Sequence, residues 1–248
     1  MNDPRPKSRL PALLLLLALG LLGLGAAVYF RPAPVEGDPA LLLPDSSVTV
    51  ESTTTELAFI PAEAKGASLV FYTGARVPAE AYAYLGRGLA ARGHLVVIAR
   101  FPLGFALFAP DRAEGIMARR GAGGTWALGG HSLGGAMAAA WLHGHPEAAK
   151  GLLLLASWPP SDADFSASTL SVLSLSASMD GLATPTKIEA ARHLLPPSAR
   201  SLVIEGGNHA GFGNYGSQDG DGKAAIDPAR QRAAVLDETL AFLESLAG

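Results

Sequence analysis

Residues 129–135 read Gly-Gly-His-Ser-Leu-Gly-Gly, which sets Ser132 in a Gly-x-Ser-x-Gly pattern. This pattern is typical of a sharp turn between a strand and a helix, in which the serine backbone is strained and its hydroxyl is exposed. Glycines at 130 and 134 suit the turn because they carry no side chain that could collide with neighbouring backbone. The chain contains 29 glycines, so the pattern needs support from the residues around it.

The segments on either side of the motif give that support. Residues 125–128 form a short, mostly apolar run that predicts a buried parallel strand. Residues 133–145 are rich in alanine, carry apolar side chains at helical spacing and end before Pro146, as expected for a helix. The order of strand, turn and helix predicts that Ser132 is a nucleophile.

A serine hydroxyl is a weak nucleophile at neutral pH and requires a base, which itself requires an orienting group. Residues 171–177 predict a strand with Asp180 just beyond its end, and residues 202–204 predict a later strand, followed by a loop that carries His209. We predict His209 as the general base and Asp180 as the carboxylate that orients it. Glu205 is the alternative acid because it also follows a strand.

The remaining histidines occupy places that favour solvation or helix capping. His94 opens an apolar run, His143 and His145 end the helix after the nucleophile, and His193 lies inside another predicted helix. His131 adjoins the nucleophile, and we interpret it as a packing residue beneath the turn.

Two backbone N–H groups are expected to stabilise the oxyanion of an acyl-transfer reaction. The first belongs to Leu133, which follows the nucleophile. The second is assigned to Ala75, in the loop after a strand predicted at residues 67–72. An ordinary strand-to-helix turn is the alternative interpretation of that loop.

Four segments of the chain, at residues 71–77, 129–135, 178–185 and 206–213, resemble the α/β-hydrolase superfamily. The chain is most similar to the small lid-less group of dienelactone hydrolases, although Ser132 stands where those enzymes carry a cysteine. The chain order Ser132, Asp180, His209 is the order of that superfamily. The resemblance covers about residues 47–246 and implies hydrolysis of an ester or a related acyl bond.

The alternation of elements predicts one α/β domain at residues 47–248, with a mainly parallel sheet flanked by helices. Strands are predicted at about residues 47–60, 68–72, 95–100, 125–129, 151–156, 171–177 and 202–205. Helices are predicted at about residues 78–92, 110–120, 133–145, 185–195 and 228–246.

The predicted site is open and shallow, which suits small acyl groups. Residues 158–169 are too few for the helical lid that many relatives of this superfamily insert between two late strands. Aromatic residues that follow strand ends are candidates for the substrate pocket, with packing at its rim as the alternative: Trp158, Phe105, Phe108, Phe212 and Tyr215.

The amino-terminal segment is strongly apolar. Residues 10–30 carry no charge and are long enough to span a bilayer as a helix. Cations are more numerous before this stretch than after it, which predicts a cytoplasmic tip at residues 1–9, a transmembrane signal anchor at 10–30 and an extracytoplasmic domain. A cleaved signal peptide, and hence secretion, is the alternative. Residues 31–46 contain four prolines and predict a stiff spacer.

Composition narrows the choice of function. The chain has no cysteine, so disulfides, a thiolate nucleophile and cysteine-ligated zinc are excluded. A formal net charge of −3 gives no basic stripe for nucleic acid. The predicted partners are a small-molecule acyl substrate and, through residues 10–30, a membrane, and the mechanism needs no metal or organic cofactor. The oligomeric state stays open.

Two further glycine-rich patterns are interpreted as loops. Residues 211–216 match a dinucleotide-binding pattern, but no helix is predicted after them. Residues 219–222 read Asp-Gly-Asp-Gly yet lack the later glutamate of a calcium loop, which favours a solvated loop. The sequence therefore predicts a serine hydrolase. An acyltransferase on the same three residues, or a membrane-tethered binding module without catalysis, are the alternatives.

Overall fold

The computed structural model describes residues 20, 23–25, 28, 30–121 and 124–246 of the chain. The chain divides into two compact units, Met1–Pro32 and Ala33–Gly248. Among the described residues, no helix is both long and apolar enough to cross a membrane. The predicted cytoplasmic tip lies outside the described residues, and most of the predicted span at residues 10–30 does too.

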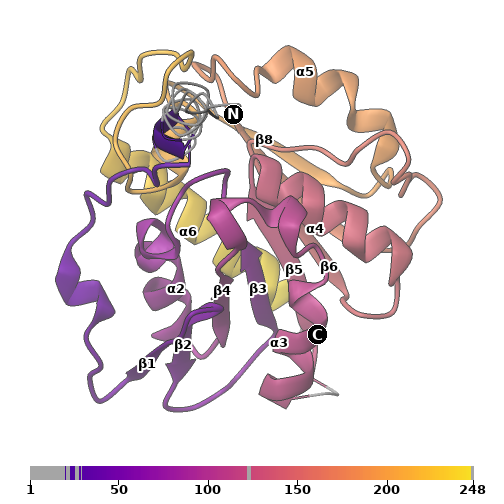
Figure 1. The fold of residues 1–248 in the computed structure, drawn as a ribbon. Coiled ribbons are helices and arrows are strands. Elements are labelled where there is room, and N and C mark those ends of the chain that lie inside the picture. Colours follow the sequence, from indigo (N-terminus) through magenta and orange to yellow (C-terminus); the bar gives the residue numbers. More distant parts are fainter. Residues whose placement is uncertain (1–19, 21–22, 26–27, 29, 122–123, 247–248) are drawn as a thin grey trace, which may run out of the picture. The chain divides into compact units, whose positions relative to one another are not determined.

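An eight-stranded sheet forms the centre of the second unit (Figure 1). Its strands are β1 (Val48–Ser52), β2 (Glu56–Pro61), β3 (Ser68–Tyr72), β4 (Val96–Ala99), β5 (Trp126–His131), β6 (Gly151–Leu155), β7 (Ser171–Ala177) and β8 (Arg200–Ile204). They lie in the order β1-β2-β4-β3-β5-β6-β7-β8, and only the pairings of β1 with β2 and of β2 with β4 are antiparallel. The predicted mainly parallel sheet is therefore confirmed.

The single strand predicted at residues 47–60 is wrong, because the chain reverses there and forms the β1–β2 hairpin. Thr53 Oγ1 accepts hydrogen bonds from the N–H groups of Thr55 and Glu56. A threonine hydroxyl that bonds to backbone two and three residues ahead stabilises a turn, which interrupts the strand.

Helices cover both faces of the sheet (Figure 1). They are α2 (Ala83–Ala90), α3 (Arg112–Gly121), α4 (Leu133–Gly144), α5 (Pro185–Ala190) and α6 (Pro228–Ser245), with shorter 3-10 turns between them. The predicted helix at 78–92 is divided into a 3-10 turn (Ala79–Tyr82) and α2, and the one at 185–195 ends early at α5.

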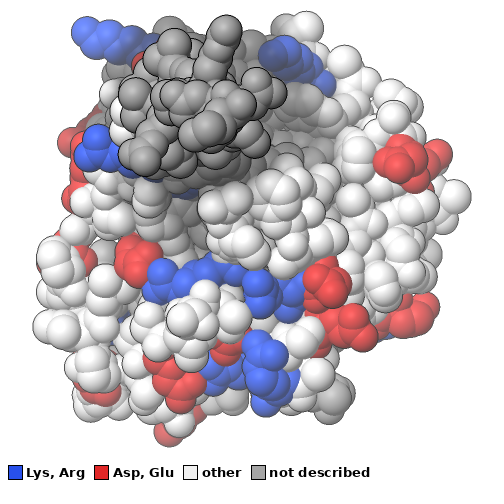
Figure 2. Space-filling model, viewed as in Figure 1, with Lys and Arg blue, Asp and Glu red and all other residues white. Residues whose placement is uncertain are grey.

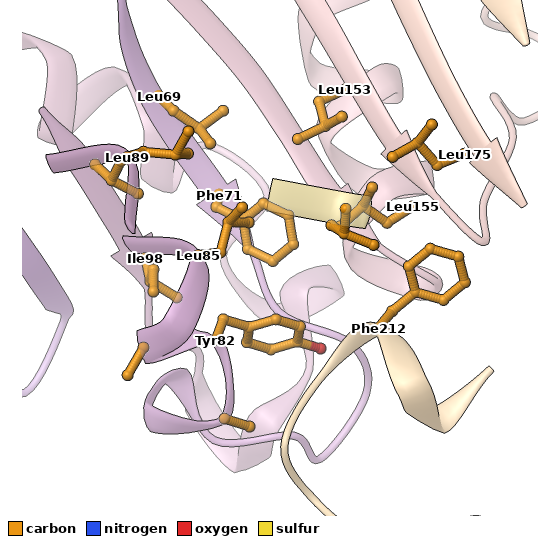
Figure 3. Packing of buried hydrophobic residues seen from close by; sticks show 14 of the residues in the cluster. Leu69, Phe71, Tyr82, Leu85, Leu89, Ile98, Leu153, Leu155, Leu175 and Phe212 are labelled. Carbon is orange, nitrogen blue, oxygen red and sulfur yellow. The ribbon is translucent and has the colours of Figure 1, made fainter. Parts of the chain in front are cut away.

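Alternate side chains of β3 enter two hydrophobic clusters, one on each face of the sheet. Leu69 and Phe71 pack with residues of α2 and α6, as Figure 3 shows for Leu85 of α2. Val70 and Tyr72 belong to the other cluster, with residues of α3 and α4. Burial on both faces explains why the central strands β4 and β6 carry no polar side chain.

The segment predicted to be a stiff spacer packs against the domain instead. The Ala33 N–H donates to the Arg76 carbonyl at 2.8 Å, and the Glu36 N–H donates to the Asn214 carbonyl at 2.9 Å. Leu41 and Leu42 contact the hydrophobic cluster beside α2. Residues 33–46 are therefore part of the folded unit, because their apolar side chains and backbone groups find partners on it.

Residues 156–170, all of them described, join β6 to β7 through turns without a helix. Ala163 and Phe165 of this connection are buried against the cluster that contains α4. The predicted absence of a helical lid at this position is confirmed, and the edge of the sheet above β5 and β6 stays accessible.

Positive and negative side chains lie side by side on the face drawn in Figure 2. One group of ion pairs ties α3 to the β1–β2 hairpin: buried Glu56 accepts from Arg119 and Arg120 at 2.6 Å each, and Arg120 also reaches Glu51. Burial alone would raise the pKa of Glu56, but the hydrogen bonds from the two arginines outweigh it and hold that pKa below its usual value.

We predict opposite effects for two Gly→Ala substitutions inside helices. A Cβ on Gly86 of α2 would overlap the Phe59 ring, so Gly86→Ala should destabilise the fold by about 1–3 kcal/mol. On Gly115 of α3 a Cβ meets only the end of the Arg119 side chain, so Gly115→Ala should stabilise by about 0.5–1 kcal/mol through helix propensity. Urea denaturation of the two variants measures both changes. Equal shifts of the same sign would contradict the packing described for α2.

Candidate active site

Ser132 lies in the sharp turn between β5 and α4 that the sequence predicts. Its φ of 54° and ψ of −125° place a non-glycine residue in a strained backbone region. The Ser132 N–H donates to the Leu155 carbonyl at 2.9 Å, and its own carbonyl accepts from the Ala136 N–H at 3.2 Å and from Ser157 Oγ at 2.7 Å. These three hydrogen bonds hold the strained conformation.

The glycines of the motif allow α4 to approach the end of β3. A Cβ on Gly130 would lie 2.6 Å from the Tyr72 carbonyl oxygen, and one on Gly134 would overlap the Thr73 carbonyl oxygen. No side chain fits at either position without moving backbone. The glycines at 130 and 134 are therefore required by close packing, as the sequence predicts.

Asp180 and His209 follow the neighbouring parallel strands β7 and β8, whose carboxyl ends meet at one edge of the sheet. His209 Nδ1 and Asp180 Oδ2 are 2.8 Å apart, and both side chains are buried. Asp180 Oδ1 accepts from the N–H groups of Leu182 and Ala183 at 2.8 and 2.7 Å. A carboxylate with this set of partners favours a proton on His209 Nδ1, so Nε2 is left as the proton acceptor.

Glu205, the alternative acid, is exposed at the end of β8. The hydrogen bond to His209 Nδ1 comes from Asp180. The geometry thus favours Asp180 over Glu205 as the group that orients the imidazole.

Ser132 and His209 line the same cavity, whose volume is about 330 Å³. The described residues of its wall are mostly apolar and include no Asp, Glu, Lys or Arg: Ser132, Leu133, Ala136, Ala156, Ser157, Trp158, Pro160, Leu182, Ala183 and His209. The cavity has the size and polarity of a site for a small, uncharged group.

Of the predicted pocket aromatics, Trp158 lines this cavity. Phe212 and Tyr215 do not, and their prediction as pocket residues is wrong. Both are buried, with ring centroids 5.7 and 6.2 Å from that of His131, because the loop that follows His209 turns back into the core. Phe105 also lies outside the cavity wall and contacts Phe108 at 6.1 Å between ring centroids.

The two predicted oxyanion donors lie in different surroundings. Leu133 lines the cavity at the first turn of α4, where backbone N–H groups lack partners within the helix. In the loop after β3, the N–H groups of Gly74, Arg76 and Val77 donate to Tyr82 Oη and to the carbonyls of Gly104 and Gly74. The N–H of Ala75 is therefore the candidate for the second oxyanion donor from that loop, although Ala75 is not part of the cavity wall.

His131, interpreted above as a packing residue, precedes Ser132 in the chain and is buried. Tyr82 Oη accepts the Gly74 N–H at 3.1 Å and lies at hydrogen-bond distance, 2.8 Å, from His131 Nδ1. Burial, followed by the neighbouring His209, holds the pKa of His131 well below its usual value. His131 is therefore neutral near pH 7 and packs against His209 with ring centroids 4.6 Å apart.

The loop at residues 219–222, predicted to be solvated, is joined to the site through Asp221. Its carboxylate accepts hydrogen bonds from the N–H groups of His209 and Ala210 at 3.1 and 2.9 Å. The Asp-Gly-Asp-Gly pattern marks this loop in the sequence, but its partners are distant in the chain and carry no local signal.

Among the described residues, no group of three or more His, Cys, Asp or Glu side chains is arranged to hold a metal ion.

Residues 68–233, more than half of the chain, match a family model described as the alpha/beta hydrolase family. No curated protein matches the chain in sequence.

Solved structures share the fold. A predicted CIB-like hydrolase from Thermoplasma acidophilum has a TM-score of 0.63 at 13% identity, over 81% of this chain and 100% of that one. A Thermus thermophilus protein has a TM-score of 0.57 at 22% identity, over 80% of this chain and 98% of that one. An alpha/beta hydrolase enzyme from the metagenome of Mar Chica lagoon sediments, Morocco, has a TM-score of 0.54 at 15% identity, over 66% of this chain and 90% of that one. The likeness to these structures shows the fold, and the match of residues 68–233 to the family model shows that the chain belongs to the alpha/beta hydrolase family.

Proposed function

We propose that this alpha/beta hydrolase is a serine hydrolase that cleaves a carboxylic ester or a related acyl bond. The observation that carries the proposal is the position of His209, which is hydrogen-bonded to Asp180 at 2.8 Å and shares a cavity with Ser132. A buried carboxylate that holds one imidazole nitrogen leaves the other to accept the serine proton.

The proposed reaction proceeds in two halves. Ser132 Oγ attacks the substrate carbonyl carbon while His209 Nε2 takes its proton, and the N–H groups of Leu133 and Ala75 stabilise the oxyanion. His209 then gives the proton to the leaving oxygen, the carbon–oxygen bond breaks, and an acyl-enzyme remains. Water, deprotonated by His209, then attacks the acyl carbon. The bond to Ser132 Oγ breaks, His209 returns the proton to that oxygen, and the acid is released. Asp180 orients the imidazole and stabilises its cation.

The cavity supports short, uncharged acyl groups as substrates. Its volume of about 330 Å³ is at the lower end of ligand pockets, and its wall offers a carboxylate no cation. An acyl group with its own carboxylate would lose water there without gaining a partner, which is unfavourable.

We also propose that residues 10–30 anchor the chain in a membrane with the hydrolase unit outside the cytoplasm, and cleavage of this segment with secretion is the alternative. The apolar, uncharged sequence of this segment supports the anchor. Since the folded unit begins at Ala33, only Arg31 and Pro32 separate it from the proposed span.

Ser132→Ala should lower ester hydrolysis by on the order of a thousandfold or more and leave the fold intact, because the nucleophile is lost while the binding cavity stays. A fluorophosphonate that reacts with activated serines should label the wild-type chain at Ser132 and not the variant. Ser171→Ala, at the exposed start of β7, is the matched control and should keep both properties. Equal hydrolysis by the Ser132 variant would refute the proposal. Labelling without hydrolysis would favour transfer to another acceptor, and absence of labelling would favour a binding module.

Acyl preference should follow the cavity wall. Butyrate esters should be hydrolysed with a kcat/KM at least about tenfold higher than hemisuccinate esters of the same alcohol, because the succinyl carboxylate loses its hydration. Trp158→Ala removes the largest side chain of the wall and should shift the preference toward longer acyl chains. A preference for the hemisuccinate would mean that a cation reaches the bound acyl group.

The anchor is tested on the chain expressed with its full amino terminus in bacteria. Extraction of membranes with alkaline carbonate should leave the chain in the pellet, and its intact mass should include residues 1–30. A soluble product whose mass corresponds to a chain that begins near residue 28 would instead show cleavage of the amino-terminal segment. That result would overturn the anchor.

A further inference from the structure

One carboxylate outside the cavity, that of Asp221, is bonded to the loops of both Asp180 and His209. Asp221 Oδ1 accepts from the N–H groups of His209 at 3.1 Å and Gly181 at 3.2 Å, and Oδ2 accepts from Ala210 at 2.9 Å. Oδ1 also accepts from the adjacent N–H of Gly222 at 2.8 Å. Its partners thus include the amide that follows Asp180 and the amide of His209 itself.

We propose that Asp221 is a positioning residue that fixes the loop of His209 against the loop of Asp180, so that the imidazole meets both its carboxylate and Ser132. The inference rests on the proposed function of Ser132, Asp180 and His209. Asp221 does not line the cavity, and it acts on the reaction only through the groups that it holds.

Glycines bring the Asp221 loop against the loop of Asp180. A Cβ on Gly222 would overlap the Met179 carbonyl oxygen, and a Cβ on Gly181 would lie 2.5 Å from the Gly220 carbonyl oxygen. Gly220 itself has a φ of +83°, which a side chain would disfavour. The Asp-Gly-Asp-Gly pattern is therefore explained by backbone packed against backbone, and its loop is held in one place.

The same loop is tied to α6. Asn208 Nδ2 donates to the Gly222 carbonyl at 2.8 Å. The main chain of Asn208 is bonded at both ends to Gln231 of α6: its N–H donates to Oε1 at 3.0 Å, and its carbonyl accepts from Nε2 at 2.7 Å. Gln231 is fully buried. A rigid helix thus supports the residue before His209, and Asp221 supports His209 and the residue after it.

The chemistry of the partners requires a carboxylate at position 221. All four groups that face it are N–H donors, which two carboxylate oxygens satisfy together. An asparagine has one acceptor oxygen, and its NH₂ group would face an N–H without a bond.

Asp221→Asn tests this assignment in the full chain. We expect kcat per fluorophosphonate-titrated site to fall by about 10–100-fold with KM within about twofold, since the cavity wall is unchanged. Asp219→Asn removes an exposed carboxylate from the same loop and should change neither.

Asp221→Glu, which keeps the carboxylate on a longer side chain, should recover part of kcat. It also serves as the variant of choice if the asparagine form does not fold. A purely structural role would lower the temperature of unfolding in both variants but leave kcat per titrated site unchanged, and that result overturns the proposal.

A readout without turnover separates this inference from the proposed function. The proton of His209 Nδ1, hydrogen-bonded to Asp180, should give a downfield proton NMR signal in the wild-type chain, and Asp221→Asn should shift or broaden it while Asp219→Asn does not. An inactive wild-type chain would refute the proposed function yet leave this signal to decide whether Asp221 positions the ring. An unchanged signal in a folded Asp221→Asn chain refutes the positioning role.

Discussion

The hydrogen bond between His209 Nδ1 and Asp180 Oδ2 depends on the parallel order of the sheet. β7 and β8 lie side by side and point the same way, so the loops after them leave from the same edge. β5 ends at this edge too, where the Ser132 N–H extends the pairing with β6 through the Leu155 carbonyl. Residues 77 positions apart in the chain, Ser132 and His209, thus reach one cavity because strand direction is shared.

Rigidity at this edge comes from backbone groups satisfied by side chains. Ser157 Oγ holds the Ser132 carbonyl, and Tyr82 Oη holds the Gly74 N–H. Asp221 and Gln231 do the same for the loop of His209. Loops that carry reacting groups usually move more than the elements they join, and such bonds restrict that movement. The site is therefore built from short loops whose backbone groups are held by hydrogen bonds from side chains of other segments.

The sequence was sufficient to predict the parts of the structure that local patterns encode. Apolar runs located the parallel strands, and the residues beyond their ends included Ser132, Asp180 and His209. The sequence patterns gave wrong predictions where contacts between residues distant in the chain determine the structure. Asp221 resembles a solvated loop residue because its bonds reach amides up to 40 residues away in the chain, and Phe212 resembles a pocket aromatic because nothing local shows that its loop turns into the core. Residues 33–46 resemble a linker by their prolines, yet they pack on the folded unit.

Two imidazoles in contact raise the question of which one carries the proton during the reaction. His131 and His209 have ring centroids 4.6 Å apart, so a cation on both would be repulsive. His131 Nδ1 faces the neutral hydroxyl of Tyr82, whereas His209 Nδ1 faces the carboxylate of Asp180. Burial lowers the pKa of His131, which has no carboxylate to offset the loss of water. In the proposed reaction His131 therefore stays neutral, and His209, which lines the cavity with Ser132, is the ring that takes the proton.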